Sequence, residues 1–283
     1  MLFYAPLIQT STYTTELSAW RKEQEQRLMA EEGWLSVAGL DWLKEGQNSL
    51  GSQLDADVKL PSYAVSGSAG TLTLAGSEVS LDTFQDSGVT VNGSTGTHFI
   101  LKSDAQGSPD RVKVGSVTFK IIVRGKRTGV RLYDSRCEGR IQFKGRTWFK
   151  PNQGYNLKAK FVPYKPERTV PILNVLGDTE NVKMPGYVEF SIRGKKYRLD
   201  AQDEGDTLFF NFRDLTSGKQ TYGAGRFLNV PKPVNGTVQL DFNKAVNPPC
   251  AFTSFATCPL PPAQNHLKVA IPAGELTHHP IGH

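Results

Sequence analysis

Short apolar runs separated by turn-forming residues occupy most of this chain and limit the folds open to it. The runs favour valine, isoleucine, threonine and aromatic residues, and glycine, asparagine or aspartate interrupts them at close spacing. With 27 glycines and 17 prolines among 283 residues, turns are frequent along the whole length. This pattern predicts many short antiparallel strands, as in sandwiches and barrels. A hydrophobic fraction of 38% supplies enough apolar side chains for a sizeable core.

One long helix is expected ahead of the predicted strands. Thr14 or Thr15 can cap its start, and Gly33 stands where a helix usually ends. At helical spacing, one face collects the following side chains: Leu17, Trp20, Gln24 and Leu28. We expect this amphipathic face to pack on a sheet rather than to bind a partner.

The chain is predicted to be mainly β and to divide into three consecutive parts. Residues 1–33 form an N-terminal segment with the helix, residues 34–145 an antiparallel β-sandwich, and residues 146–283 a second antiparallel β unit packed against it. The predicted strands of the sandwich are residues 35–43, 58–60, 70–74, 79–81, 89–91, 98–101, 117–123 and 129–134. Those of the second unit are residues 155–161, 169–176, 186–192, 196–199 and 207–212. The second sheet is expected to stack on the first or to curl into its own open barrel.

Charge and composition argue against several classes of partner. The net charge is only +6, and the basic clusters at residues 124–127 and 193–196 are typical of hairpin tips, so no nucleic acid partner is expected. No window approaches the ~20 apolar residues of a membrane span, so no membrane is expected either. Residues 1–8 lack the basic region of a signal peptide, and three cysteines are an odd count for a disulfide scaffold. Cytoplasm is the predicted location.

The motifs that hold common cofactors do not occur in the sequence. It has no dinucleotide fingerprint, P-loop, Gly-x-Ser-x-Gly elbow or His-Glu-x-x-His run. We therefore expect no cofactor, and an activity of this chain would have to use its own side chains.

The segment from Asp241 to Pro262 is rich in proline and cysteine and has neither helical nor strand periodicity. Proline fixes φ and removes a backbone donor, and it forces the residue before it into extended geometry. A loop this stiff is suited to holding side chains for recognition or chemistry. We call it the proline-rich segment and expect the functional site beside it.

The two cysteines of this segment, Cys250 and Cys258, have several interpretations. A zinc site would need two further ligands, and only His266 lies close in the sequence, so no metal is predicted. A disulfide would staple the segment, which a cytosolic location disfavours. Burial as small hydrophobic side chains is the preferred interpretation. A nucleophilic Cys250 would need a histidine placed to activate it, and the sequence places none beside it.

Residues just before the proline-rich segment are candidates for ligand binding. In the run from Tyr222 to Arg226, two glycines let the backbone approach another group closely, and Arg226 can clamp a carboxylate or phosphate. A buried ion pair of Arg226 with Asp241 or Asp214 is the structural alternative, and the sequence does not decide between the two. Asp214 is expected to form a turn with Thr216.

Further candidates carry carboxylate, amide and guanidinium groups. Asp241 and Asn243 alternate along the chain and are expected to share a face, and Asn247 precedes a rigid Pro-Pro turn. A second charged group is predicted to face the same cleft from the sandwich: Arg131, Asp134 and Arg140.

Part of the chain resembles the forkhead-associated (FHA) sandwich. The resemblance rests on residues 46–52 as an opening strand and turn, residues 58–61 as the next strand, residues 89–93 with an Asn-Gly turn, and residues 114–119 as a closing hairpin. It implies an FHA-like β-sandwich. Ser52 stands where that family reads phosphate with an arginine, so phosphothreonine binding is not expected.

Nearly the whole chain resembles the DUF1684 proteins, a family of unassigned function. The resemblance rests on residues 33–51, residues 214–228 and the proline-rich segment, followed by residues 265–267 and 273–275. Val246 stands where tyrosine is expected, and Gln264 and His266 stand where glutamate and arginine are expected. The resemblance implies kinship and brings no reaction with it.

Two functions of different class follow from these residues, and the sequence leaves open whether the chain is an enzyme. The first is a cofactor-independent enzyme that acts on a small polar or acidic molecule in a cleft between the two β units. Its predicted binding residues are Arg226, Arg131, Arg140, Asn243, Asn247 and Cys250. Its predicted catalytic residues are Asp241 or Asp134 as general acid–base, with a pKa raised by burial, and Tyr222 as a donor. The alternative is a non-catalytic module whose FHA-like sandwich binds a protein partner.

Overall fold

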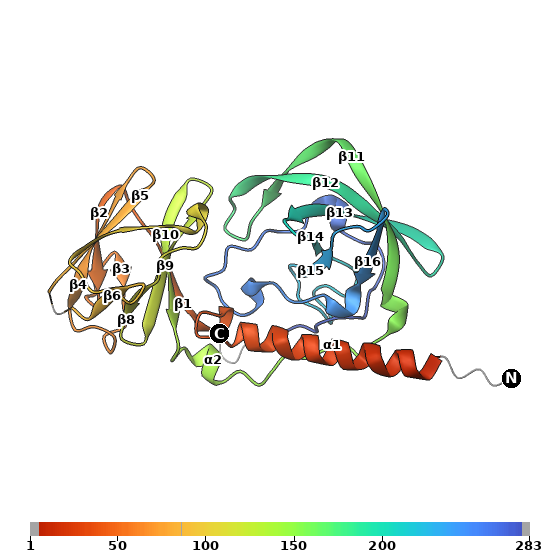
Figure 1. Cartoon of the computed structure of the whole chain (residues 1–283), viewed down its shortest axis with the longest axis horizontal. Helices are drawn as coiled ribbons and strands as arrows, with labels where there is room; N and C mark the ends of the chain where they lie inside the picture. The colour runs from red at the N-terminus through yellow and green to blue at the C-terminus, as the bar shows by residue number, and fades with distance from the viewer. Residues whose placement is uncertain (1–5, 86, 279–283) are drawn as a thin grey trace. The chain divides into compact units, whose positions relative to one another are not determined.

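The computed structural model describes residues 6–85 and 87–278, with side chains from Thr12 onward, and the chain forms two compact units (Figure 1). The larger unit combines the residues up to Arg27 with those from Lys144 onward. The inserted unit is Leu28–Phe143. Strands dominate both units, which confirms the predicted mainly-β class. Among the described residues, no helix is long and apolar enough to cross a membrane.

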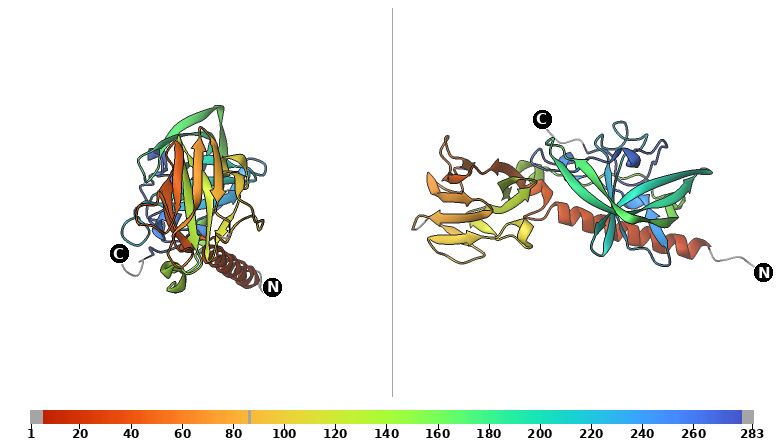
Figure 2. Two further views of the ribbon diagram at one scale, coloured as in Figure 1. Left: turned by 90° about the vertical axis from the view of Figure 1, so that its left-hand side faces the viewer. Right: turned by 90° about the horizontal axis from the view of Figure 1, so that it is seen from above.

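The inserted unit is built from two five-stranded sheets, whose strands are visible in Figures 1 and 2. One sheet has the order β1 (Val37–Trp42), β10 (Arg127–Asp134), β9 (Val117–Arg124), β8 (Val112–Val114) and β6 (Val89–Val91). The other has the order β3 (Val58–Lys59), β2 (Gly46–Gly51), β4 (Ser68–Ala75), β5 (Glu78–Thr83) and β7 (His98–Leu101). All pairs are antiparallel except the short β2–β3 pair, which is parallel. The likeness of this sandwich to the FHA fold stays a prediction.

The core of the inserted unit follows from period-two alternation along its strands. In β9, Val117, Phe119 and Ile121 are buried, while Thr118 and Lys120 between them are partly exposed. Inward side chains of both sheets form one cluster, because each sheet has a single apolar face to cover.

The larger unit is a six-stranded antiparallel sheet that curls on itself. Its order is β15 (Arg226–Pro231), β14 (Thr207–Phe212), β13 (Lys195–Glu204), β12 (Thr179–Ile192), β11 (Asn156–Leu173) and β16 (Thr237–Asp241). The two end strands, β15 and β16, also contact each other, as expected for an open barrel. The two strands predicted at residues 155–161 and 169–176 are one strand, β11, with a register shift between Pro163 and Arg168.

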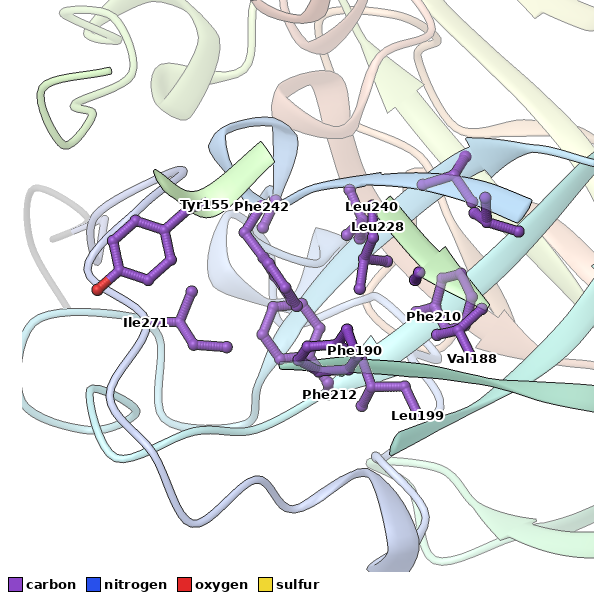
Figure 3. Packing of buried hydrophobic residues seen from close by; sticks show 14 of the residues in the cluster. Tyr155, Val188, Phe190, Leu199, Phe210, Phe212, Leu228, Leu240, Phe242 and Ile271 are labelled. Carbon is purple, nitrogen blue, oxygen red and sulfur yellow. The ribbon is translucent and has the colours of Figure 1, made fainter. Parts of the chain in front are cut away.

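Aromatic and aliphatic side chains together fill the interior of this sheet (Figure 3). The ring of Phe242 lies 5.6 Å from that of Phe190 and 5.4 Å from that of Phe212, measured between centroids. Both pairs are tilted or edge-on, the arrangement that the ring quadrupoles favour. Phe212 ends β14 and Phe242 directly follows β16, so these rings join parts of the sheet that are not neighbours in the strand order.

The long helix, α1 (Pro6–Leu28), begins well before Thr14 and Thr15, the residues predicted to cap it. Proline is favoured at the first helical position, because its missing N–H would have no partner there. Leu17 is buried, and the ring of Trp20 meets that of Trp148 edge-on at 6.0 Å. The helix therefore contacts the larger unit through residues of the predicted stripe.

Short helical turns complete the structure. They are α2 (Glu138–Ile141) and the 3-10 turns η1 (Trp34–Ser36), η2 (Asp104–Gln106), η3 (Gln153–Tyr155), η4 (Phe242–Lys244), η5 (Pro249–Ala251) and η6 (Ala263–Asn265). Three of them, η4 to η6, lie within or directly after the proline-rich segment, which otherwise has no regular structure. The segment is thus held mainly by tertiary contacts.

Candidate functional site

A cavity of about 300 Å³ opens on the larger unit beside the proline-rich segment. Its apolar walls come from the end of β11, at residues 171–173, from Ala224 and from residues 260–263. Arg213 and His266 also line it. We call this space the Arg213 cavity.

The backbone of Arg213 is fixed by neighbours on both sides. Its N–H donates to the carbonyl of Asn265 at 3.0 Å, and its carbonyl accepts from Leu267 N at 2.8 Å. Asn265 is itself buried and bonded through its side chain to backbone atoms of Asp200 and Asn211. Arg213 as a whole is exposed. The structure therefore presents an exposed cation on a backbone that is fixed by hydrogen bonds.

The ring of His266 has a defined hydrogen position. Its Nε2 lies 3.1 Å from the carbonyl oxygen of Pro261. Because a carbonyl can only accept, Nε2 carries the hydrogen, and Nδ1 is the lone-pair nitrogen of the neutral ring. In this tautomer Nδ1 can accept a hydrogen bond from a bound molecule.

Gly225 allows the walls of the cavity to approach each other. Its φ of +113° lies in the left-handed region. A Cβ on Gly225 would lie 2.7 Å from the oxygen of Phe212, 2.8 Å from Cγ of Pro261 and 3.2 Å from Cγ of Arg213. The close approach predicted for the Gly-Ala-Gly run therefore occurs within the fold, between β14, β15 and the proline-rich segment.

Replacing Gly225 with alanine is expected to lower the free energy of unfolding by about 1–3 kcal/mol, through overpacking and an unfavourable φ. The matched control is Gly194→Ala, because Gly194 has a φ of +77° and open space around its Cβ position. Urea denaturation of both variants separates the steric clash from the backbone strain. Equal destabilisation of the two variants would contradict the packing role of Gly225.

Arg226 does not face the Arg213 cavity but is fully buried. Its Nη2 lies 2.5 Å from the carboxylate of Asp214, and the guanidinium also donates to the carbonyls of Ile271 and Ala273. Its exposed fraction is 0%. The structural alternative of a buried ion pair therefore holds, with Asp214 as the partner. Asp214 also forms the predicted turn, accepting from Thr216 N at 2.6 Å.

A second buried carboxylate, Glu275, was missed in the sequence. Only 1% of the residue is exposed, and its carboxylate accepts from Asn247 N at 2.7 Å and from the guanidinium of Arg146. Burial raises the pKa of Glu275 to about 7, although Arg146 and Asn247 act in the opposite direction. The sequence feature that could have indicated this buried carboxylate is the preceding Gly274. Its φ of +83° and crowded Cβ position suit glycine, and this backbone conformation directs Glu275 inward.

Tyr222 and Cys250 meet at the proline-rich segment. The hydroxyl of Tyr222 donates to the carbonyl of Cys250 at 2.9 Å. Cys250 is half-buried and Cys258 is buried, and both are thiols rather than a disulfide. The backbone N–H of Cys250 points to Sγ of Cys258 at 3.2 Å. Among the described residues, no group of three or more His, Cys, Asp or Glu side chains is arranged to hold a metal.

Asp241 and Asn243 meet, but not by strand alternation. Asp241 caps the turn η4, and its carboxylate accepts from Asn243 N at 3.1 Å and from Asn243 Nδ2 at 2.9 Å. The hydroxyl of Tyr13 lies 3.0 Å from both carboxylate oxygens. Burial and the charge of Asp241 raise the pKa of Tyr13. Through these contacts Asp241 links α1 to the sheet. The catalytic role of Asp241 stays a prediction.

The three candidates in the inserted unit have partners within that unit. Arg131 is buried with its guanidinium 4.9 Å from the ring centre of Trp34. Asp134 accepts from the hydroxyl of Tyr63. Arg140 donates to the carbonyls of Met29 and Ser135 at 2.8 Å and 2.9 Å. Structural contacts thus occupy all three side chains, and their ligand-binding and catalytic roles stay predictions.

Comparison with protein families finds a match to the region that contains the cavity. A family model described as a protein of unknown function (DUF1684) matches residues 141–276. A solution NMR structure of an uncharacterised protein from Haloarcula marismortui is 33% identical and covers 49% of this chain and 79% of its own, with a TM-score of 0.42. No curated protein matches the chain.

Proposed function

The chain belongs to the DUF1684 family of proteins of unknown function, and we propose that this member is a cofactor-independent enzyme that acts on a small carboxylic acid held in the Arg213 cavity. The observation that carries the proposal is the pairing of an exposed guanidinium with walls of proline, leucine and isoleucine. Such a site matches a ligand with one anionic end and an apolar body.

Arg213 supplies the recognition of the anionic end. A guanidinium can bind a carboxylate through two parallel hydrogen bonds, which fixes orientation as well as charge. Within residues 6–85 and 87–278, the side chain of Arg213 forms no hydrogen bond and no ion pair. The buried Arg226 differs, because its guanidinium is paired with Asp214. The proposed anchor is therefore Arg213, in place of the Arg226 predicted from the sequence.

His266 supplies the proton chemistry of the proposed enzyme. Its Nε2–H bond to Pro261 leaves the Nδ1 lone pair for a ligand. Histidine is the side chain that enzymes use most often for proton transfer, and this lone pair makes His266 the candidate general base. Arg213 and His266 together support one class of reaction step, the transfer of a proton at an atom near the bound carboxylate.

Benzoate is expected to bind the wild-type protein, and Arg213→Gln is expected to weaken that binding at least about tenfold, since a charge-assisted pair contributes roughly 1.5–3 kcal/mol. Isothermal titration at low salt measures both affinities. Benzamide, which has the same ring without the charge, is the ligand control. Arg193→Gln removes the same charge from the exposed β12–β13 hairpin and is expected to leave the affinity unchanged.

Three results would count against this proposal. If benzoate binds the wild type and Arg213→Gln with equal affinity, Arg213 is not the anchor. If benzamide binds as tightly as benzoate, the site does not select an anionic ligand. If carboxylic acids bind through Arg213 but a panel of them shows no turnover, and His266→Gln leaves binding intact, the protein is a binding module for small acids rather than an enzyme.

A further inference from the structure

The two thiols of the proline-rich segment lie within reach of each other. Sγ of Cys258 is 3.2 Å from the backbone nitrogen of Cys250. Adding the N–Cα bond of about 1.5 Å places this sulfur no more than roughly 4.7 Å from the Cα of Cys250. Because Sγ lies about 2.8 Å from its own Cα, the two Cα atoms are at most roughly 7.5 Å apart. A disulfide joins Cα atoms about 4.4–6.8 Å apart, so side-chain rotation with at most a small backbone adjustment is expected to bring the two sulfurs together.

The backbone around both cysteines is fixed independently of any bond between the sulfurs. Ala251 N donates to the carbonyl of Pro248 at 2.9 Å. The carbonyl of Cys258 accepts from Val175 N at 3.0 Å, which ties this end of the segment to the loop after β11. Since the backbone is held on both sides, the thiols stay neighbours in the reduced protein.

The two thiols have different surroundings, and the difference indicates which of them reacts first with an oxidant. Cys250 is half-buried and therefore reachable, whereas only 5% of Cys258 is exposed. A hydrogen bond from the Cys258 thiol lowers the pKa of Cys250, and the Tyr222 hydroxyl adds to this effect. A thiolate is the reactive form of cysteine, so Cys250 is the side chain that reacts first.

We propose that Cys250 and Cys258 are a reversible dithiol–disulfide pair, in which Cys250 is the attacking cysteine and Cys258 the resolving one. The oxidant is a small-molecule disulfide such as oxidised glutathione. This inference does not depend on the proposed enzyme activity, because it concerns only the thiols of the segment.

The exchange balances in two steps. The Cys250 thiolate attacks one sulfur of the small disulfide, the S–S bond breaks, and one glutathione thiolate leaves. The Cys258 thiolate then attacks the Cys250 sulfur of this mixed disulfide, and the second glutathione thiolate leaves. Two protein thiols are oxidised, one small disulfide is reduced to two thiols, and the two protons pass to the leaving thiolates.

Incubation of the reduced protein with oxidised glutathione is expected to lower its intact mass by about 2 Da. Peptide mapping should then identify a disulfide between Cys250 and Cys258. Dithiothreitol should restore the original mass. The Cys258→Ser variant is expected to stop at the mixed disulfide on Cys250, and Cys250→Ser should form no internal disulfide. The melting temperature of the oxidised form should rise by roughly 5 °C.

The third cysteine provides the matched control. Cys137 lies in the inserted unit with partial exposure, so Cys137→Ser should react like the wild type. The proposal fails if Cys137 is modified while Cys250 and Cys258 remain thiols. It also fails if Cys258→Ser and the wild type give the same mixed disulfide as the end product. Circular dichroism of each serine variant shows that the fold is retained before the thiols are compared.

Discussion

Replacing Arg226 with alanine is expected to lower the free energy of unfolding of the larger unit by about 3–5 kcal/mol. The variant leaves the carboxylate of Asp214 without its cation at a site where neither side chain is more than 1% exposed. It also removes the donors that satisfy the carbonyls of Ile271 and Ala273. Leaving buried polar groups unpaired adds to the cost of the lost ion pair.

Chemical denaturation followed by tryptophan fluorescence measures this loss. The double variant Arg226→Met with Asp214→Leu removes both charges together, and it should recover much of the stability, because the desolvation cost of the pair disappears with it. Arg193→Ala, at an exposed hairpin, should change the free energy by less than about 0.5 kcal/mol. If Arg226→Ala is as stable as Arg193→Ala, the buried pair does not support the fold.

Stability is expected to fall between about pH 4.5 and pH 7 because of Glu275. Burial raises the pKa of this carboxyl from 4.5 to about 7, so the folded protein holds a proton that the unfolded chain has released. The stabilisation from this proton is complete below the unfolded pKa and is lost as the pH rises through the folded pKa. The difference between 4.5 and about 7 corresponds to about 3 kcal/mol.

The variant Glu275→Gln removes this titration while keeping an oxygen for the bond from Asn247 N. Free energies of unfolding at pH 5 and pH 8 are compared between the variant and the wild type. From pH 5 to pH 8 the wild type should lose about 2–3 kcal/mol more than the variant, because part of the shift lies below pH 5. Glu180→Gln, an exposed change on β12, should show the wild-type dependence on pH. A parallel pH dependence of Glu275→Gln and the wild type would refute the raised pKa.

Most strands could be predicted because alternation and turn residues are local properties of the sequence. β14 and the alternating part of β9 appear where the pattern places them. The local pattern fails for β11, because Pro163 and Pro166 are typical of a break between two strands. The strand continues through them with a shift in register, since β12 pairs with β11 on both sides of the irregularity. This continuity depends on the neighbouring strand and is not contained in the local pattern.

The candidate site was harder to predict than the strands. Arg226 could be recognised as important, but its partner and its burial depend on where residues 271–273 pass. Arg213 and His266 are far apart in sequence and come together as an isolated parallel bridge. Alone, each resembles an ordinary surface residue, and only the fold shows that they line one cavity.

The division of the larger unit into two separate stretches of chain has a consequence for its synthesis. The contact between Tyr13 and Asp241 spans 228 positions in the sequence. As the ribosome delivers the chain from its N-terminus, the inserted unit emerges complete and is free to fold first. α1 must wait, already outside the ribosome, until β16 has been made. During that interval the side chains that α1 later buries, such as Leu17, have no partner in the larger unit and stay in water.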